Sequence, residues 1–419
     1  MPTRDPEPFR PPGFDRRELL RRGALLGAAA ALSPLPSASR AESGAASAPE
    51  PRVRGFGVLG RTRLRVSDIS FGSSRLAGDE SLVRHAVERG INYFDTADSY
   101  RGGESELTLG RALRGQRDRV LLASKVKCGA ADDRATLMRT LERSLSRLQT
   151  GHVDVYFNHA VNDLEQLTHP EWFEFADRAR AQGKIRFTGM SGHGGRLVEC
   201  LDVALDQGLV DVILVAHNFG QDPAFYERFS RSFDFVATQP DLPRVLAKAR
   251  AKGVGVVAMK TLRGARLNDM RPYEHGGASF AQAAFRWTLA SPNVDALVVT
   301  MNSAAQVDEY LGASGARELA RGDGALLRRY AVRSAATQCR YGCDACLASC
   351  PSQVPISDVL RTRMYAEDYG DPVLARREYA ELGGGAEACL SCAETRCAAA
   401  CPHGLDVPEL TRRTARLLG

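Results

Sequence analysis

The sequence predicts an α/β protein that consists of a closed (β/α)8 TIM barrel followed by a small cysteine-rich domain. From Phe56 to about Ser314, a short β-branched segment that ends in polar residues alternates eight times with a helical pattern. Beyond this region, the last 81 residues hold eight of the ten cysteines of the chain. The 419 residues leave room for two or three domains. The two observations separate a barrel domain from a cysteine-rich domain.

The first 41 residues have the layout of an export signal. Arg16 and Arg17 precede a weakly apolar Ala/Leu stretch over residues 23–32, and small residues and prolines follow. This order is typical of a secretory signal peptide, and the paired arginines resemble a twin-arginine signal. We therefore expect residues 1–41 to direct export to the periplasm and residues 42–55 to form a linker. A disordered basic tail on a cytoplasmic protein is the alternative.

The barrel is expected over residues 56–315. A hairpin around Gly60 comes first and is placed to close the floor of the barrel. Several helices end at a glycine, the residue that most readily takes the left-handed conformation at a helix C-terminus. The eight strands are expected at residues 69–72, 91–95, 120–125, 153–159, 185–190, 210–216, 254–259 and 294–300.

Alternating strands and helices imply parallel strands joined by right-handed crossovers. Eight such units in about 250 residues is the number that closes a barrel rather than an open sheet. A connecting helix is expected over residues 316–335, and the cysteine-rich domain over residues 336–419. Because the chemistry of such barrels lies at the carboxyl ends of the strands, we look for site residues there.

The composition excludes several classes of function. With 44% apolar and 25% charged residues, the chain has the composition of an ordinary soluble globular protein. The net charge of +6 is modest and scattered, so the sequence shows no nucleic-acid-binding footprint. No apolar run is long enough to cross a bilayer, and no transmembrane segment is expected.

Three consecutive strands end in residues that suit proton transfer. Asp95 ends the second strand with Tyr100 five residues later, Lys125 ends the third strand, and His159 ends the fourth. A neighbouring ammonium lowers the pKa of a phenol, which is about 10 in the free side chain, and a carboxylate keeps that ammonium charged. The histidine is placed to orient a carbonyl oxygen. Singly, each residue has an ordinary structural explanation, but together they form a proton donor matched to hydride delivery at a carbonyl.

At these residues the chain resembles the aldo/keto reductase superfamily. The stretch "GINYFDTADSYRGGESELTLGRAL" carries the resemblance, and "LGRTRLRVSDISFG" and "GKIRFTGMSGH" extend it over roughly residues 56–315. The resemblance implies that Tyr100 is the general acid, that Asp95 and Lys125 tune it, and that His159 orients the carbonyl. It also implies nicotinamide-dependent reduction of a small aldehyde or ketone, or oxidation of the corresponding alcohol.

The resemblance also implies a dinucleotide site, with NADP(H) as the expected cofactor. Several positions differ from the pattern of the family: Leu214 replaces a glutamine, Met259 a stacking tyrosine and Tyr310 an asparagine, and Gly192 with His193 replaces an Asn-containing continuation. A helix that begins after the eighth strand can still receive a phosphate at its N-terminus. The residues expected to bind the dinucleotide are Ser191, Lys260, Asn302 and Ser303.

The cysteines form two runs, Cys339-x3-Cys343-x2-Cys346-x3-Cys350-Pro and Cys389-x2-Cys392-x4-Cys397-x3-Cys401-Pro. Bacterial ferredoxins repeat C-x2-C-x2-C-x3-C-P, and the fourth cysteine of each run binds the cluster of the other run. The runs here carry one inserted residue in the first gap and two in the middle gap, respectively. This comparison predicts a ferredoxin-like iron–sulfur domain with two [4Fe–4S] clusters.

The crossing rule assigns one cluster to Cys339, Cys343, Cys346 and Cys401, and the other to Cys350, Cys389, Cys392 and Cys397. Two C-x2-C knuckles that bind zinc are an alternative, although zinc leaves four cysteines unexplained. Disulfides are a second alternative if the protein is exported, and clusters without a redox role are a third.

The sequence therefore predicts an aldo/keto reductase-type oxidoreductase whose two clusters relay electrons to or from an electron-transfer protein or a quinone-linked partner. Clusters are inserted in the cytoplasm, and the twin-arginine route carries folded proteins, so the two ends of the chain are consistent with each other. A cytoplasmic NADPH-dependent carbonyl reductase with structural clusters is one alternative, and a non-catalytic electron-transfer or scaffold protein is another. Three loop residues are candidates for the substrate pocket or for simple packing: Trp172, His193 and Tyr273.

Overall fold

The computed structural model describes residues 50–419 except 194–195, 220–238, 240, 263–269, 275–278, 335–338, 340–342, 344, 368–371 and 384. The expected signal peptide and most of the expected linker lie outside the described residues. Among the helices that are described, none is long and apolar enough to cross a membrane.

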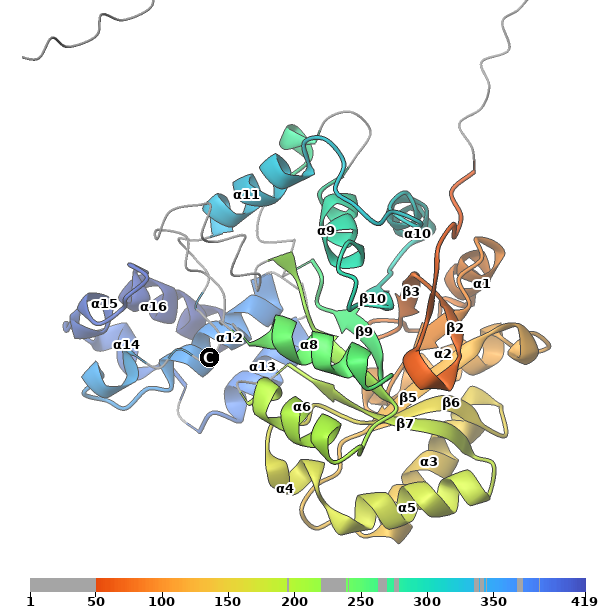
Figure 1. Cartoon of the computed structure of the whole chain (residues 1–419). Helices are drawn as coiled ribbons and strands as arrows, with labels where there is room; N and C mark the ends of the chain where they lie inside the picture. The colour runs from red at the N-terminus through yellow and green to blue at the C-terminus, as the bar shows by residue number, and fades with distance from the viewer. Residues whose placement is uncertain are drawn as a thin grey trace, which may run out of the picture. The chain divides into compact units, whose positions relative to one another are not determined.

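Eight parallel strands close into a barrel in the order β10-β3-β4-β5-β6-β7-β8-β9 (Figure 1). Each expected strand is present, so the predicted barrel is confirmed. β7 runs two residues beyond its expected end, because Ser191 and Gly192 still pair with Leu214 and Val215 of β8. The strands are β3 (Ile69–Gly72), β4 (Tyr93–Asp95), β5 (Leu121–Val126), β6 (Val153–Asn158), β7 (Ile185–Gly192), β8 (Val212–Ala216), β9 (Gly255–Met259) and β10 (Ala296–Thr300).

Helices surround these strands, and buried apolar side chains from both fill the space between them (Figure 1). As the sequence predicts, Gly90, Gly183, Gly208 and Gly253 follow helices α1, α5, α6 and α8 with a positive φ. The helices around the barrel are α1 (Glu80–Glu88), α2 (Glu104–Ala112), α3 (Arg134–Leu148), α4 (Leu164–Leu167), α5 (Pro170–Ala181), α6 (Leu197–Asp206), α8 (Leu242–Ala251), α9 (Phe280–Leu289) and α10 (Ala304–Leu311).

The hairpin of β1 (Phe56–Val58) and β2 (Arg65–Ser67) closes the amino end of the barrel. Its buried residues Leu59, Leu64 and Val66 pack against the side chains that fill the barrel interior. The turn approaches the barrel so closely that a Cβ on Gly60, whose φ is +46°, would lie 2.2 Å from the carbonyl oxygen of Gly253. Only glycine fits there, and the expected floor of the barrel is present.

Helix α11 (Asp323–Ser334) lies within the range expected for the connecting helix. A buried ion pair fixes its start, because Arg286 of α9 donates to both carboxylate oxygens of Asp323 at 2.7 and 2.8 Å. The aromatic ring of Tyr330 stacks on Phe280 with 4.4 Å between centroids. These contacts join α11 to the barrel helix α9.

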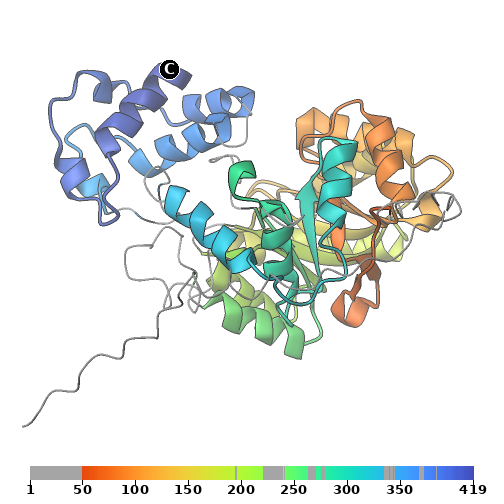
Figure 2. The same ribbon diagram turned by 90° about the horizontal axis from the view of Figure 1, so that it is seen from above.

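The cysteine-rich region consists of helices that gather around a core of their own, drawn in blue in Figure 2. Val359, Leu405 and Leu418 are buried in this core, together with Cys346. From residue 339 onward, the described residues form helices and connecting segments and no strand, and the expected ferredoxin-like domain stays a prediction. The helices are α12 (Ile356–Glu367), α13 (Pro372–Ala380), α14 (Ala388–Ser391), α15 (Arg396–Ala399) and α16 (Val407–Leu418).

Candidate functional site

Three neighbouring strands bring Asp95, Tyr100, Lys125 and His159 together at the carboxyl end of the barrel. Asp95 is the last residue of β4, Lys125 is the penultimate residue of β5, and His159 directly follows β6. Tyr100 begins the short 3-10 helix η2 (Tyr100–Gly103), which connects β4 to α2. The strand order therefore groups the four residues as the sequence predicts.

The ammonium of Lys125 is the centre of this group. Its Nζ donates to Asp95 Oδ1 at 2.6 Å and to the carbonyl oxygen of Thr96 at 2.6 Å. The hydroxyl of Tyr100 lies 3.5 Å from the same Nζ, at the outer limit for a hydrogen bond. Lys125 is 1% exposed and Asp95 is 4% exposed. The ion pair is thus removed from water, and the phenol lies at its edge.

Burial sets the protonation state of the group. Burial raises the pKa of Tyr100 above its ordinary value, although the charge of Lys125 lowers it. The charge of Lys125 lowers the pKa of the phenol, as predicted, but the expectation of a net decrease is wrong, because burial outweighs that charge. Burial also opposes the charge on Lys125, yet Asp95 and Tyr100 outweigh it, and the pKa of Lys125 is raised. At neutral pH the site therefore holds a protonated phenol beside an ammonium.

His159 packs edge-on against Tyr100, with 5.8 Å between ring centroids and an interplanar angle of 78°. Burial and the charges of Lys125, Lys127 and Lys260 lower the pKa of His159 to about 3. The imidazole is therefore neutral at physiological pH and carries one N–H group. A neutral imidazole beside the phenol can donate one hydrogen bond to an oxygen that reaches both.

The residues expected to bind a dinucleotide follow β7, β9 and β10. Ser191 is buried near the end of β7, and its Oγ accepts a hydrogen bond from the backbone N–H of Ala160 at 2.9 Å. Ser303 caps α10 as expected and accepts from the N–H of Gln306 at 3.3 Å. Asn302 is exposed beside it.

Lys260 directly follows β9 with a φ of +56°, a conformation that is uncommon for a residue with a side chain. Its side chain keeps an exposed surface, but surrounding protein and the positive charge of Arg361 lower its pKa to about 8. The structure thus places at this part of the rim an amine whose pKa lies only slightly above neutral pH.

Three of the departures from the family pattern are packed residues. Leu214 and Met259 line the barrel interior, and Tyr310 is buried with its ring 5.0 Å from that of Phe285. Two of the three loop candidates also pack: Trp172 stacks on Tyr156, and Arg329 lies 4.6 Å from the ring centroid of Tyr273. These five positions are explained by packing.

Two histidines at strand ends lie outside the predicted catalytic and dinucleotide-binding residues: His193, which is a candidate only for the substrate pocket or for packing, and His217, to which no motif in the sequence points. The charge of Lys260, together with burial, lowers the pKa of His193 well below its ordinary value. Burial lowers the pKa of His217 to about 4, and neither of its ring nitrogens has a hydrogen-bond partner among the residues that the structure describes. Both follow a strand directly, as His159 does, so position at a strand end was the signal that could have found them.

All ten cysteines have free thiols in the structure. In the cysteine-rich region, burial and the nearby thiols of Cys339, Cys401 and Cys343 raise the pKa of Cys346 to about 12. A second group lies apart from the first. Burial and the nearby thiols of Cys350 and Cys392 raise the pKa of Cys389. Burial and the thiols of Cys350 and Cys389 likewise raise the pKa of Cys397. Each group contains three cysteines of one run and the fourth of the other, and the assignment of each group to one cluster stays a prediction.

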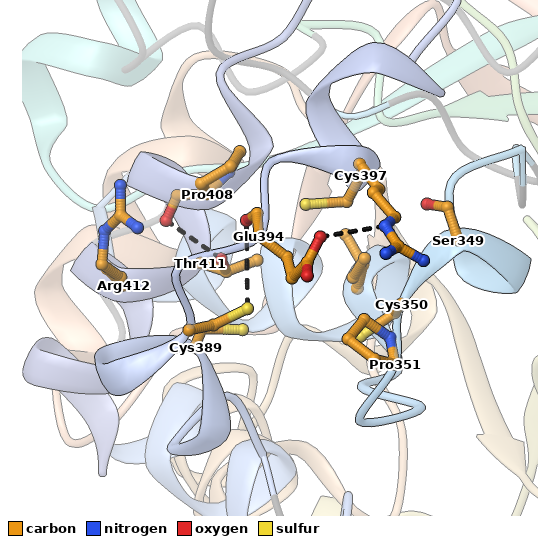
Figure 3. A pocket seen from close by; sticks show the side chains of 12 residues that line it. Ser349, Cys350, Pro351, Cys389, Glu394, Cys397, Pro408, Thr411 and Arg412 are labelled. Atoms are coloured by element: carbon orange, nitrogen blue, oxygen red, sulfur yellow. Dashed lines mark hydrogen bonds and ion pairs between the residues drawn. The ribbon is translucent and has the colours of Figure 1, made fainter.

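The second group lines a pocket between the two runs (Figure 3). The backbone N–H of Val354 donates to Cys350 Sγ at 3.4 Å. Thr411 and Arg412 of α16 also line this pocket, as do Glu394 and Arg396. Among the described residues, no three Cys, His, Asp or Glu side chains converge tightly enough to hold one metal ion.

Comparisons with known proteins agree with this barrel. The aldo/keto reductase family matches residues 69–273. An uncharacterized oxidoreductase, YrpG of Bacillus subtilis, is 30% identical over 254 residues, which cover 55% of this chain and 73% of YrpG. L-galactose dehydrogenase of Arabidopsis thaliana is 28% identical over 293 residues, which cover 61% of this chain and 86% of that enzyme.

Among solved structures, an aldo/keto reductase from Klebsiella pneumoniae in complex with NADP and acetate aligns with a TM-score of 0.52. It is 26% identical, and the alignment covers 66% of this chain and 95% of that one. The chain therefore belongs to the aldo/keto reductase family, and its barrel is that of an oxidoreductase.

Proposed function

We propose that this protein interconverts a small carbonyl compound and its alcohol on the barrel, and that two [4Fe–4S] clusters relay the electrons to or from a redox partner. The observation that carries the proposal is the buried Asp95–Lys125 pair beside Tyr100 in a chain that also groups eight thiols into two sets of four. The reaction adds two electrons and two protons to a C=O bond, or removes them from the alcohol.

Of the two protons, the one that goes to the carbonyl oxygen comes from the barrel residue Tyr100, and the one that goes to the carbon comes from solvent water. Tyr100 is protonated at neutral pH because burial raises its pKa, so it donates to the carbonyl oxygen as the carbon is reduced. Lys125, held charged by Asp95, stabilises the phenolate that this donation leaves. His159 is neutral and donates a hydrogen bond that orients the same oxygen. In the oxidative direction, the phenolate of Tyr100 accepts the hydroxyl proton of the alcohol, and the phenol is formed again.

The donor set of the cysteine-rich region fits two cubane clusters. Each iron of such a cluster takes one thiolate, so the four ligands surround a volume rather than a single ion. The first set is Cys339, Cys343, Cys346 and Cys401, and the second is Cys350, Cys389, Cys392 and Cys397. When bound, each cluster supplies transfer of one electron, so the two together match a two-electron reaction.

A second candidate is an NADPH-dependent carbonyl reductase of the cytoplasm whose clusters are structural. The observation that favours it is the NADP complex of the related Klebsiella barrel. Ser191, Lys260, Asn302 and Ser303 would hold the dinucleotide, and Ser303 at the start of α10 would face a phosphate. The fit is partial, since apolar Leu214 and Met259 stand where the family places polar or stacking groups.

Export by the twin-arginine route, with residues 1–41 as the signal, is part of the first proposal. A dinucleotide that dissociates would not be renewed outside the cytoplasm, and electrons delivered through clusters avoid that need. An electron-transfer protein or a quinone-linked enzyme would then be the partner.

Anaerobic purification with iron and sulfide assays tests the clusters. We expect a brown protein with about eight irons and eight sulfides per chain. Loss of iron in Cys350→Ser, with full iron in Cys128→Ser, would show that the iron depends on the two groups, because Cys128 is buried in the barrel core. A colourless protein that contains zinc would overturn the proposal.

Activity is then assayed on a panel that includes benzaldehyde and L-galactose, with reduced or oxidised methyl viologen and, separately, with NADPH or NADP. Viologen-linked turnover that is lost in Tyr100→Phe supports the relay. Turnover with the dinucleotide alone supports the second candidate. If Tyr100→Phe leaves all activities unchanged, the barrel is not the site of the reaction.

A further inference from the structure

The segment that carries Tyr100 has an unusual backbone. Arg101, Gly102 and Gly103 follow Tyr100 directly, and their φ values are +53°, +68° and +97°. Glycine takes such values freely, whereas the left-handed conformation is unfavourable for a residue with a side chain such as Arg101. A segment of this kind keeps one shape only where its surroundings fix it.

Arg147, in the last turn of α3, reaches this segment from outside the barrel. Its Nη1 donates to the carbonyl oxygen of Asp98 at 3.1 Å, two residues before Tyr100. The guanidinium also lies against Gly103, where an added Cβ would be 2.3 Å from Cζ of Arg147. One side chain therefore contacts the chain on both sides of Tyr100.

Glu106 connects Arg147 to the strand of Lys125. It is fully buried in the first turn of α2, and its Oε2 lies 3.2 Å from Arg147 Nη1. Its Oε1 accepts a hydrogen bond from Ser124 Oγ at 2.7 Å, and Ser124 precedes Lys125 in β5. The neighbouring Ser105 Oγ lies 2.8 Å from the carbonyl oxygens of two residues of the loop after β3. The start of α2 is thus anchored on both sides.

The Tyr100 hydroxyl has little tolerance for movement. It lies 3.5 Å from Lys125 Nζ, so a displacement of a few tenths of an ångström away from the ammonium ends this contact. Lys125 itself is fixed by Asp95 and Thr96. The distance between the Tyr100 hydroxyl and Lys125 Nζ therefore depends on the position of the segment that carries Tyr100, which Arg147 and Glu106 contact.

We propose that Arg147, through Glu106 and the backbone of Asp98 and Gly103, is a positioning residue that sets the place of the Tyr100 hydroxyl relative to Lys125. The inference rests on the proposed function, in which Tyr100 is the proton donor. Arg147 touches neither Tyr100 nor the reacting atoms in this account. It acts by fixing the backbone on which the phenol is carried.

The test compares Arg147→Lys with Arg117→Lys in the full-length protein. Lysine keeps the charge, but its shorter side chain does not extend to the place where Nη1 donates to both Asp98 and Glu106, and it has no planar guanidinium to lie against Gly103. Arg117 is the matched control, because it pairs with buried Asp154 at 2.8 Å and donates to the carbonyl oxygens of Val120 and His152. That pair lies at the start of β6, and β6 ends at the site.

The deciding measurement is the ¹³Cζ tyrosine NMR resonance of Tyr100, assigned as the signal that is absent in Tyr100→Phe. We expect it to shift or broaden in Arg147→Lys and to stay unchanged in Arg117→Lys. With benzaldehyde as the probe, kcat should fall about 10–100-fold in Arg147→Lys while KM changes about 2-fold at most, because misplacement of a catalytic group acts on the transition state.

An unchanged Tyr100 resonance and kcat in Arg147→Lys would overturn the inference. If Arg147→Lys does not fold, the double variant Arg147→Met with Glu106→Gln removes both buried charges at similar volume, and the same two readouts decide. The proposed function fails separately, if Tyr100→Phe retains activity, and in that case the NMR resonance still reports whether Arg147 positions the phenol.

Discussion

The buried pair of Asp95 and Lys125 gives the sharpest test of the site as a physical arrangement. Asp95→Asn keeps the volume of the side chain but leaves the ammonium of Lys125, which is 1% exposed, without its counter-charge. Removing one partner of a buried pair costs about 3–5 kcal/mol. For a domain of this size, that corresponds to a decrease of about 6–20 °C in the unfolding midpoint.

Tryptophan fluorescence during urea unfolding suits this measurement, because both tryptophans of the chain, Trp172 and Trp287, lie in barrel helices. The double variant Asp95→Asn with Lys125→Met removes the charge as well, and we expect it to recover most of the lost stability.

The control is Asp202→Asn, which removes pairs of similar length at the surface. Asp202 lies 2.6 Å from Arg244, whose side chain is 53% exposed, and 2.8 Å from Lys248, so the substitution removes two surface pairs. Exposed pairs contribute about 0–1 kcal/mol. If Asp95→Asn costs no more than Asp202→Asn, the ammonium of Lys125 is not desolvated and our account of the site is wrong.

Three further predictions follow from the geometry. Tyr100→Phe should lower carbonyl turnover about 100–10,000-fold with little change in stability, as measured by kcat and urea unfolding. The pKa of His159 is lowered to about 3, so the unfolded chain binds a proton below about pH 6.5 that the folded protein does not. Stability should therefore fall as the pH decreases from about 6.5 toward 3, and less steeply in His159→Gln. Cys350→Ser and Cys389→Ser should remove the same EPR signal, and Cys401→Ser the other.

A specific result would contradict each of these three predictions. Full activity in Tyr100→Phe would exclude the phenol as the acid. An identical pH dependence of stability in His159→Gln would place the imidazole in water. If Cys350→Ser and Cys401→Ser remove one and the same signal, the fourth cysteines do not cross between the runs.

The barrel could be predicted because local patterns determine it. The β-branched segments, the helical periodicity and the glycines at helix ends specify eight strand–helix units, and the parallel order then places Asp95, Lys125 and His159 on adjacent strands. Boundaries were less accurate. β7 continues to Gly192 because β8 offers it pairing partners, and this depends on a neighbour that is distant in the sequence.

The rest of the site depends on burial, which a sequence pattern does not contain. The net increase in the pKa of Tyr100 arises because surrounding protein outweighs the charge of Lys125. The place of Arg147 could not be predicted, since it is one of several arginines in α3 and only the fold brings it to Gly103. The helical character of the cysteine-rich region was also missed, because the cysteine spacing specifies ligands and not the elements between them.

Transfer of electrons between the barrel and the clusters is the central claim, and one measurement tests it directly. The protein is purified anaerobically, its clusters are reduced with a stoichiometric amount of dithionite, and a panel of aldehydes, ketones and aldoses is added while EPR follows the reduced clusters. We predict that a carbonyl substrate reoxidises the clusters in the wild-type protein and does so far more slowly in Tyr100→Phe. Clusters that stay reduced with every carbonyl compound, in a protein that turns over the same compounds with NADPH, would contradict the account.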